Sequence, residues 1–317
     1  MINTKKTRVA VIGVGSLGQW HAKTYFNLKS AVLVGVYDIN RKRAQEIASL
    51  YDCRVFDSLE SLAGNVDAAS IVVPTDKHYE IFRQLAEMGI HALVEKPIAD
   101  SMEAAEEMIN IADKKNLILQ VGHIERFNPV MKFLEGNITA PRFIEAIRIA
   151  PYPPARYNAP PRGTEVSVVL DLMIHDIEII LHLVNSAISE IHAIGVPVLS
   201  KTEDIANARI VFSSGCVANI TASRISSEKM RKIRVFQEDT YLSLDYMNQN
   251  GKLCHKSSAG IETVEVPIEK KEPLEAELES FINCVQTHNT PVVSGVEASR
   301  ALRIAAEICE IIKRKPC

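Results

Sequence analysis

Along the first third of the chain, short apolar runs rich in β-branched residues alternate with stretches whose apolar residues follow the helical period. The runs predict strands at residues 8–12, 32–37, 68–73, 91–94 and 117–121. The intervening stretches predict helices at residues 17–28, 41–51, 79–88 and 102–114. Strands that are apolar at nearly every position are typical of a parallel sheet covered on both faces. The alternation therefore predicts a doubly wound α/β domain.

The pattern changes after about Gly122, where prolines punctuate the chain around one predicted strand, 143–149, and one long predicted helix, 168–184. Strand candidates then follow without helices between them, at 191–198, 207–212, 217–225, 231–236, 240–246 and 263–268. Leu242 and Leu244 alternate with polar residues, as expected for an antiparallel sheet with one buried face. Two further helices are predicted at 274–288 and 296–313. We expect a doubly wound α/β domain over residues 1–122 and an α+β domain over residues 123–317.

Length and composition agree with two globular domains. The chain has 317 residues, 47% apolar and 24% charged, and a net charge of -3, so no overall field attracts nucleic acid or an anionic membrane surface. None of the six cysteines forms a CxxC pair, which argues against a zinc site or a disulfide framework. The N-terminus lacks the features of a signal peptide, and no stretch is long and apolar enough to span a membrane. We expect a cytoplasmic protein.

A glycine motif lies directly after the first predicted strand. Gly13, Gly15 and Gly18 form a GxGxxG sequence at the start of the first helix. The first glycine permits a tight turn, the second lets the backbone approach a pyrophosphate, and the third lets helix and strand pack closely. The helix N-terminus adds positive potential. This turn, with Ser16 and Leu17, is the predicted site for the phosphates of a dinucleotide.

Asp38 ends the second predicted strand, 20 residues after Gly18 (38 − 18). A carboxylate in this place binds both hydroxyls of a ribose and repels a 2′-phosphate, so NAD is favoured over NADP. Arg41 and Arg43 follow closely. They either weaken this preference or are solvated residues of the next helix.

Glu95, Lys96 and Pro97 follow the predicted strand at 91–94. The carboxyl ends of parallel strands face the ligand crevice, and proline holds the preceding residue extended and permits a cis bond. A lysine in this place can donate a hydrogen bond to a substrate hydroxyl and stabilise negative charge on its oxygen. The tripeptide by itself is more often a plain strand end.

Asp171 and His175 are four residues apart on one face of an otherwise apolar predicted helix. Burying them is costly unless something pairs with them. The histidine can accept a hydroxyl proton while hydride leaves the same carbon. A satisfied core histidine and a metal-binding pair are the alternatives. Because no third ligand has a suitable spacing, we expect no metal.

Taken in order, the glycine motif, Glu95-Lys96-Pro97 and the Asp171–His175 pair resemble the glucose–fructose oxidoreductase, inositol dehydrogenase and MocA family over essentially the whole chain. The resemblance implies a Rossmann domain followed by a domain whose open sheet forms a homodimer or homotetramer. It also implies oxidation or reduction of a sugar or cyclitol hydroxyl with a nicotinamide cofactor.

The same resemblance assigns roles to individual residues. It implies that Lys96, His175 and Asp171 are catalytic and contact the substrate. Glu95 and Lys96 also belong to the implied cofactor site. The turn beside the nicotinamide ribose is implied to contain Pro74, Thr75 and His78.

Two short stretches, 122–129 and 171–176, further resemble enzymes that oxidise the 3-hydroxyl of UDP-N-acetylglucosamine or its uronic acid, in preparation for 3-amino sugars of lipid A or surface polysaccharide. The candidate substrate residues are then also His123, Arg126, Asn128, Arg156 and Tyr157. Arginine can grip a diphosphate and tyrosine can stack on uracil, although both arginines also suit surface or interdomain salt bridges. The alternatives are a dehydrogenase of a free cyclitol or monosaccharide and a non-catalytic dinucleotide sensor.

Overall fold

The structure, a computed structural model, describes residues 6–154, 161, 163–258 and 260–314. The chain forms two compact units. The first consists of Met1–Phe127 with Glu272–Ser299, and the second of Asn128–Lys271 with Arg300–Cys317. The first part of this division lies close to the expected boundary at residue 122, whereas the return of the C-terminal segment to the first unit was not expected.

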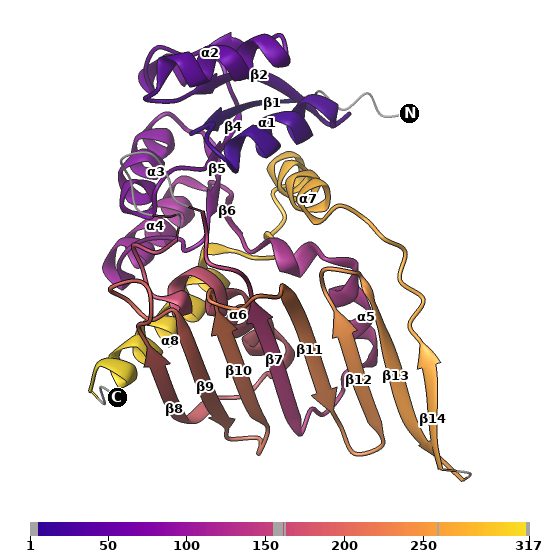
Figure 1. Ribbon diagram of the computed structural model, residues 1–317. Helices are drawn as coiled ribbons and strands as arrows, with labels where there is room; N and C mark the ends of the chain where they lie inside the picture. Colours follow the sequence, from indigo (N-terminus) through magenta and orange to yellow (C-terminus); the bar gives the residue numbers. More distant parts are fainter. Residues whose placement is uncertain (1–5, 155–160, 162, 259, 315–317) are drawn as a thin grey trace. The chain divides into compact units, whose positions relative to one another are not determined.

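The first unit is built on a six-stranded parallel sheet with the order β3-β2-β1-β4-β5-β6 (Figure 1). Its strands are β1 (Thr7–Ile12), β2 (Ala31–Tyr37), β3 (Arg54–Val55), β4 (Ala68–Ile71), β5 (His91–Glu95) and β6 (Leu119–Gly122). The order reverses between β1 and β4, which creates the crevice where doubly wound folds bind ligands. The predicted Rossmann fold is confirmed.

Helices connect these strands: α1 (Gly18–Asn27), α2 (Arg41–Leu50), α3 (His78–Glu87) and α4 (Met102–Lys115), with short 3₁₀ turns η1 (Glu60–Leu62), η2 (Thr75–Lys77) and η3 (Ile124–Phe127). The helix α7 (Pro273–Thr287) also belongs to this unit. Leu278, Phe281 and Ile282 of α7 are fully buried in one apolar cluster with residues of β1 and α1. This burial explains why the segment lies with the first unit although its sequence follows the second.

The second unit contains an eight-stranded sheet with the order β14-β13-β12-β11-β7-β10-β9-β8 (Figure 1). Its strands are β7 (Phe143–Ile149), β8 (Ile188–Val196), β9 (Ile205–Phe212), β10 (Val217–Ser223), β11 (Met230–Phe236), β12 (Thr240–Asp245), β13 (Asn250–Ser257) and β14 (Gly260–Glu265). All neighbours are antiparallel except β7 and β10. The predicted mostly antiparallel sheet is confirmed.

Helices cover one face of this sheet. They are α5 (Pro129–Asn137), α6 (Ile174–Leu183) and the later part of α8 (Gly295–Arg314). A π-helical turn, η4 (Val169–Met173), lies directly before α6. The alternation expected for a sheet with one buried face is clear in β9, where Ala206, Ala208 and Ile210 are buried and Asn207 and Arg209 are exposed.

Apart from the 3₁₀ turns, three elements were not predicted. β3 has only two residues, β13 is polar along most of its length, and α5 begins at a proline that follows an N-cap asparagine. The predicted single helix at 168–184 was wrong in one respect, because residues 169–173 form a π-helical turn. In the described part of the chain, no helix is long and apolar enough to cross a membrane.

Candidate dinucleotide and catalytic site

The glycine turn has the geometry that its spacing predicts. Gly13 has a φ of +83°, and a Cβ there would strike the carbonyl oxygen of Val72 at the end of β4. A Cβ on Gly18 would strike the carbonyl of Gly13. An ideal Cβ on Gly15, in contrast, meets nothing within 4 Å, and Gly15 itself is exposed. Gly13 and Gly18 therefore pack closely against the protein backbone, whereas the backbone at Gly15 is accessible to solvent.

The start of α1 is able to receive an anion. Its N-cap residue, Leu17, makes no side-chain capping bond, and the first turn contains no acidic residue. Ser16 and Leu17 are exposed. The first backbone N–H groups of a helix carry partial positive charge and require acceptors, so this end fits a pyrophosphate.

Asp38 lies at the end of β2 and connects it to the glycine turn. Its Oδ2 accepts a hydrogen bond from the backbone N–H of Val14 at 2.8 Å, and its Oδ1 accepts one from Asn40 at 2.8 Å. A carboxylate offers about four acceptor sites, so acceptor capacity remains for ribose hydroxyls. Ile39 follows Asp38 and is 95% exposed, an apolar side chain that the sequence reasoning did not single out.

The two arginines after Asp38 are engaged with protein groups. The Nε of Arg43 donates to the carbonyl of Val14 at 3.0 Å, and its other nitrogens bond to Gln19 and Glu46. Arg41 forms an exposed ion pair with Asp57 at 2.7 Å. Arg43 thus supports the glycine turn, and both arginines have protein partners.

Lys96 follows β5 at the carboxyl edge of the parallel sheet, and the Lys96–Pro97 peptide bond is cis. Lys96 is half-buried. The preceding Glu95 turns toward α1, where its Oε1 contacts Nε2 of His21 at 3.2 Å. A Cβ on Gly122 of β6 would approach the Glu95 carboxylate to 3.1 Å, so the glycine leaves room for this side chain.

The charge states around Lys96 follow from burial and neighbouring charges. Burial favours the neutral form of Glu95, but the hydrogen bond from His21 and the charges of His21, Lys96 and His78 outweigh it and lower the pKa of Glu95. Burial, together with the charge of Lys96, lowers the pKa of His123 to about 3. Glu95 is therefore charged and His123 neutral at pH 7.

Glu277 on α7 is a further acidic group of the first unit. Its side chain is fully buried, and neither carboxylate oxygen has a hydrogen-bond partner among the described residues. Burial and the charge of Glu95 raise the pKa of Glu277 well above its usual range. Burial therefore favours the neutral form of this carboxyl group.

His78 is the first residue of α3 and is 1% exposed. Its Nδ1 lies 3.0 Å from the carbonyl oxygen of Pro97, and its Nε2 lies 3.0 Å from that of Val73. The ring therefore bridges the end of β4 and the turn that carries Lys96. Pro74, Thr75 and His78 were predicted to contact the cofactor. Pro74 is exposed and Thr75 is half-exposed, so both are accessible, whereas His78 is buried.

In the second unit, Asp171 lies in the π-helical turn η4 and His175 in the first turn of α6. Both are partly buried. Gly163 has a φ of +81°, and a Cβ there would collide with the Asp171 carboxylate, so this carboxylate lies directly against the Gly163 backbone. π-helical turns are frequent at functional sites because they shift side chains out of the regular helical register.

A buried arginine, Arg224, binds the backbone segment from Gly163 to Val166, which contacts the Asp171 carboxylate. Arg224 is 2% exposed and donates to the carbonyls of Gly163 and Val166, while its Nε bonds to Asp204 at 2.8 Å. The neighbouring α6 is fixed to the sheet by a bidentate pair, in which Arg148 bonds to Asp176 at 2.8 and 3.0 Å.

The remaining predicted substrate residues have different outcomes. Asn128 is buried, caps α5 by accepting from Val130, and donates to the carbonyl of Tyr246 at 3.0 Å. Arg126 is 8% exposed. Arg156 and Tyr157 lie outside the described residues.

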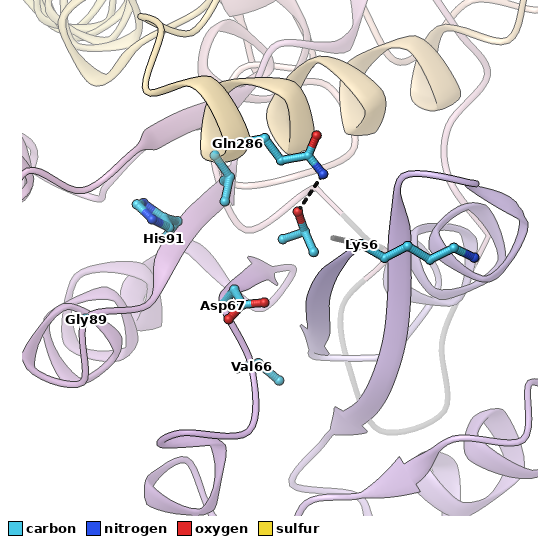
Figure 2. A pocket seen from close by; sticks show the side chains of 8 residues that line it. Lys6, Val66, Asp67, Gly89, His91 and Gln286 are labelled. Atoms are coloured by element: carbon cyan, nitrogen blue, oxygen red, sulfur yellow. Dashed lines mark hydrogen bonds between the residues drawn. The ribbon is translucent and has the colours of Figure 1, made fainter. Parts of the chain in front are cut away.

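A hollow of about 320 Å³ lies at the amino ends of the parallel strands, near the start of β1 and β5 (Figure 2). Lys6 points away from Asp67 in Figure 2, and Asp67 is paired with Arg8 at 2.7 Å. The Nδ1 of His91 accepts the backbone N–H of Ile118 at 2.9 Å. Ligands of doubly wound folds bind at the carboxyl ends of strands, so this hollow is not the dinucleotide site. Among the described residues, no cluster of His, Cys, Asp or Glu side chains is suited to a metal ion.

Known protein families match both parts of the chain. Residues 7–123 match the oxidoreductase family with an NAD-binding Rossmann fold, and residues 133–242 match the GFO/IDH/MocA C-terminal domain. The first match shows a dinucleotide-binding domain over the residues that include the glycine turn described above.

Individual relatives extend this similarity over the whole chain. UDP-N-acetylglucosamine 3-dehydrogenase of Acidithiobacillus ferrooxidans is 35% identical over 95% of this chain and 96% of its own. A solved structure of that enzyme superposes with a TM-score of 0.91, covering 98% of this chain and 99% of its own. The NAD(+)-dependent scyllo-inositol 2-dehydrogenase of Bacillus subtilis is 27% identical over 94% of this chain and 92% of its own.

Proposed function

The chain belongs to the glucose–fructose oxidoreductase, inositol dehydrogenase and MocA family, and from this premise we propose that it oxidises the 3-hydroxyl of a UDP-linked N-acetylglucosamine with NAD. The observation that carries the proposal is the full-length similarity, at 35% identity, to UDP-N-acetylglucosamine 3-dehydrogenase. The product, a 3-keto sugar, is a substrate for transamination to a 3-amino sugar of lipid A or surface polysaccharide.

Three features of the first unit support NAD as the cofactor. A carboxylate at the position of Asp38 would repel a 2′-phosphate bound beside it, and both nearby arginines have protein partners. The exposed Ile39 offers an apolar surface beside Asp38 that suits one face of an adenine ring.

In the proposed reaction, the nicotinamide ring accepts hydride from C3 of the sugar. His175 accepts the proton of the 3-hydroxyl, and Lys96 donates a hydrogen bond to the same oxygen. Asp171 orients the histidine or binds a neighbouring hydroxyl. One hydride and one proton leave the sugar, which balances its oxidation to a ketone.

The test is NADH formation by the purified protein with UDP-N-acetylglucosamine, with a 3-aminotransferase present to remove the product. Lys96→Ala and His175→Ala should each reduce kcat by about two to four powers of ten. His182→Ala is the matched control, because His182 is an exposed residue of the same helix, paired with Glu135. Turnover near the wild-type value in Lys96→Ala or His175→Ala would refute that residue's role, and no NADH from the UDP-sugar would refute the substrate.

A free cyclitol is the second candidate substrate, because the chain is also similar to scyllo-inositol 2-dehydrogenase and myo-inositol 2-dehydrogenase. A substrate panel in the same assay separates the two. An enzyme for free cyclitols would gain nothing from the UDP group, whereas a UDP-sugar enzyme should lose most of its kcat/KM with free N-acetylglucosamine.

We also propose that the chain forms a homodimer or homotetramer through the face of the eight-stranded sheet opposite its helices. Phe143, Phe236 and Tyr241 are register partners on β7, β11 and β12, and their rings contact one another in a row. An aromatic row on a sheet face is suited to an interface. Light scattering of the wild type and of Phe236→Glu tests this directly, with a smaller species expected for the variant.

A further inference from the structure

Two side chains hold carbonyl groups of the glycine turn. The Nε of Arg43, on α2, donates to the carbonyl oxygen of Val14 at 3.0 Å. The Nε2 of Gln19, on α1, donates to the carbonyl oxygen of Ser16 at 3.1 Å. The two side chains are joined, because the Nη2 of Arg43 donates to the Oε1 of Gln19 at 2.8 Å. One continuous set of hydrogen bonds therefore runs from α2 to two carbonyl groups of the turn.

These bonds fix the direction of the N–H groups that follow. A trans peptide group is planar, so its C=O and N–H bonds point in opposite directions. Both peptide groups concerned are trans. The carbonyl of Val14 faces Arg43, and the N–H of Gly15 therefore points away from the arginine. The bond to the carbonyl of Ser16 directs the N–H of Leu17 in the same manner.

The two N–H groups directed in this way are open to a ligand. Gly15 and Leu17 are exposed, and in the described part of the chain neither N–H donates to a protein acceptor. A Cβ on Gly15 would meet nothing within 4 Å, so a ligand is able to approach the backbone closely there. Backbone donors that are exposed and already fixed in direction suit the oxygens of a diphosphate.

The guanidinium group of Arg43 is fully engaged with the protein. Besides the bonds of its Nε to Val14 and of its Nη2 to Gln19, its Nη1 donates to Glu46 at 3.0 Å. An arginine that recognises a phosphate of the ligand presents a pair of free N–H groups to it. All three nitrogens of Arg43 are instead bonded to protein oxygens, so its contact with the turn is what the structure supports.

We propose that Arg43, acting with Gln19, is a positioning residue for the dinucleotide, which fixes the glycine turn in its diphosphate-binding shape before the dinucleotide binds. This inference rests on the proposed NAD cofactor and does not depend on the sugar. Binding then requires less ordering of the turn, because its N–H groups need no reorientation. Arg43 acts through the turn and is not a ligand of the phosphates.

Four variants separate this role from a general effect of positive charge. Arg43→Met removes the three side-chain donors, and Gln19→Met removes the bond to the carbonyl of Ser16. Arg43→Lys keeps the charge, but its single nitrogen replaces a fork that bonds three groups. Arg41→Met is the matched control, because Arg41 begins the same helix and forms an exposed ion pair with Asp57.

The measurement is the Kd of each folded variant for NAD and NADP, by calorimetry, and for adenosine, by ligand-detected NMR. Arg43→Met should weaken NAD binding about tenfold to a hundredfold, and Gln19→Met about threefold to tenfold. Arg43→Lys should lie between Arg43→Met and the wild type. Arg41→Met should bind NAD within about twofold of the wild type.

The choice of ligands identifies the part of the dinucleotide that is affected. NADP should weaken by the same factor as NAD in Arg43→Met, because both contain the diphosphate. Adenosine has no diphosphate and should bind that variant within about twofold of its wild-type Kd. In the enzyme assay, Arg43→Met should raise the KM for NAD and leave kcat nearly unchanged, since the lost binding is common to the ground state and the transition state.

An unchanged Kd for NAD in a folded Arg43→Met protein overturns the inference. Equal losses in Arg43→Met and Arg41→Met, or full recovery in Arg43→Lys, also overturn it, because charge alone would then explain the effect. A larger loss for NADP than for NAD would make Arg43 a ligand of the 2′-phosphate, and an equal loss for adenosine would indicate a damaged site; each contradicts the proposed role.

Two further outcomes keep the test decisive. If Arg43→Met does not fold, Gln19→Met decides, since unchanged NAD binding there overturns the inference. The expected pattern of Kd values in a protein that oxidises no sugar would refute the proposed activity and leave the inference intact.

Discussion

Each unit contains a buried group of charged side chains, and the two groups differ in how completely they are paired. In the second unit, Arg148 and Asp176 share two hydrogen bonds, and Arg224 binds Asp204 while donating to backbone carbonyls. In the first unit, His21 and Glu277 retain buried polar atoms without partners among the described residues. Complete pairing is typical of a scaffold, and incomplete pairing of groups whose charge must respond to a reaction.

Asp204 shows what complete pairing does to one carboxylate. Burial opposes its charge, but hydrogen bonds from Ser200, Arg224 and the backbone N–H of Leu199 outweigh burial and hold the pKa of Asp204 well below its usual range. A depressed carboxylate pKa stabilises the fold above the unfolded-state pKa of about 4, and this contribution is lost as pH falls further. The scaffold of the second unit should therefore be insensitive to pH near neutrality.

The largest effect that follows from this difference is expected at Asp176. Asp176→Asn keeps the shape of the side chain but removes the negative charge that binds Arg148, which is itself 3% exposed. Removing one member of a buried ion pair costs about 3–5 kcal/mol. Urea unfolding at pH 7 measures the loss, and a change below about 1 kcal/mol would show that the pair is not the scaffold described above.

His123 should cause a smaller effect that depends on pH. Its pKa is lowered to about 3 in the folded protein, against about 6.5 in the unfolded chain, so the unfolded state binds more protons between these values. Stability should therefore fall as pH decreases below about 6.5, by about 2 kcal/mol between pH 7 and pH 5.

The comparison variant for this effect is His123→Gln, which does not titrate. Its free energy of unfolding, measured at the same two pH values, should lack this pH-dependent loss. Equal slopes for the two proteins would mean that His123 does not remain neutral and buried.

The sequence predicted the parts of the site that depend on local rules. Gly13, Gly18, Asp38 and Lys96 lie where strand ends and a helix start place them, because these positions follow from the period of apolar residues and from turn chemistry. The same reasoning proposed Asp171 and His175 as catalytic candidates, but it did not predict the π-helical turn that carries Asp171. Nothing in the periodicity distinguishes that turn from an α-helix.

The buried pairs were beyond the reach of local reasoning. His21 and Glu95 are separated by 74 positions and meet only through the packing of α1 on the sheet. Glu277 lies in a helix whose sequence alternates acidic and apolar residues, so it resembles a solvent-facing position until α7 is seen to pack in the first unit. Tertiary packing, rather than propensity, decides which of these acids is buried.

The smallest effect is expected at Glu277, and it completes the contrast with Asp176. The Glu277 side chain is buried, its carboxylate oxygens have no hydrogen-bond partner among the described residues, and burial favours its neutral form. An amide resembles a protonated carboxyl group in shape and polarity. Glu277→Gln should therefore change the free energy of unfolding by less than about 1 kcal/mol, whereas the same chemical change at Asp176 should cost several times more. The two variants are compared by urea unfolding under identical conditions. A large loss of unfolding free energy in Glu277→Gln would mean that the Glu277 carboxylate is charged and paired. The buried charged groups of the two units would then not differ in pairing.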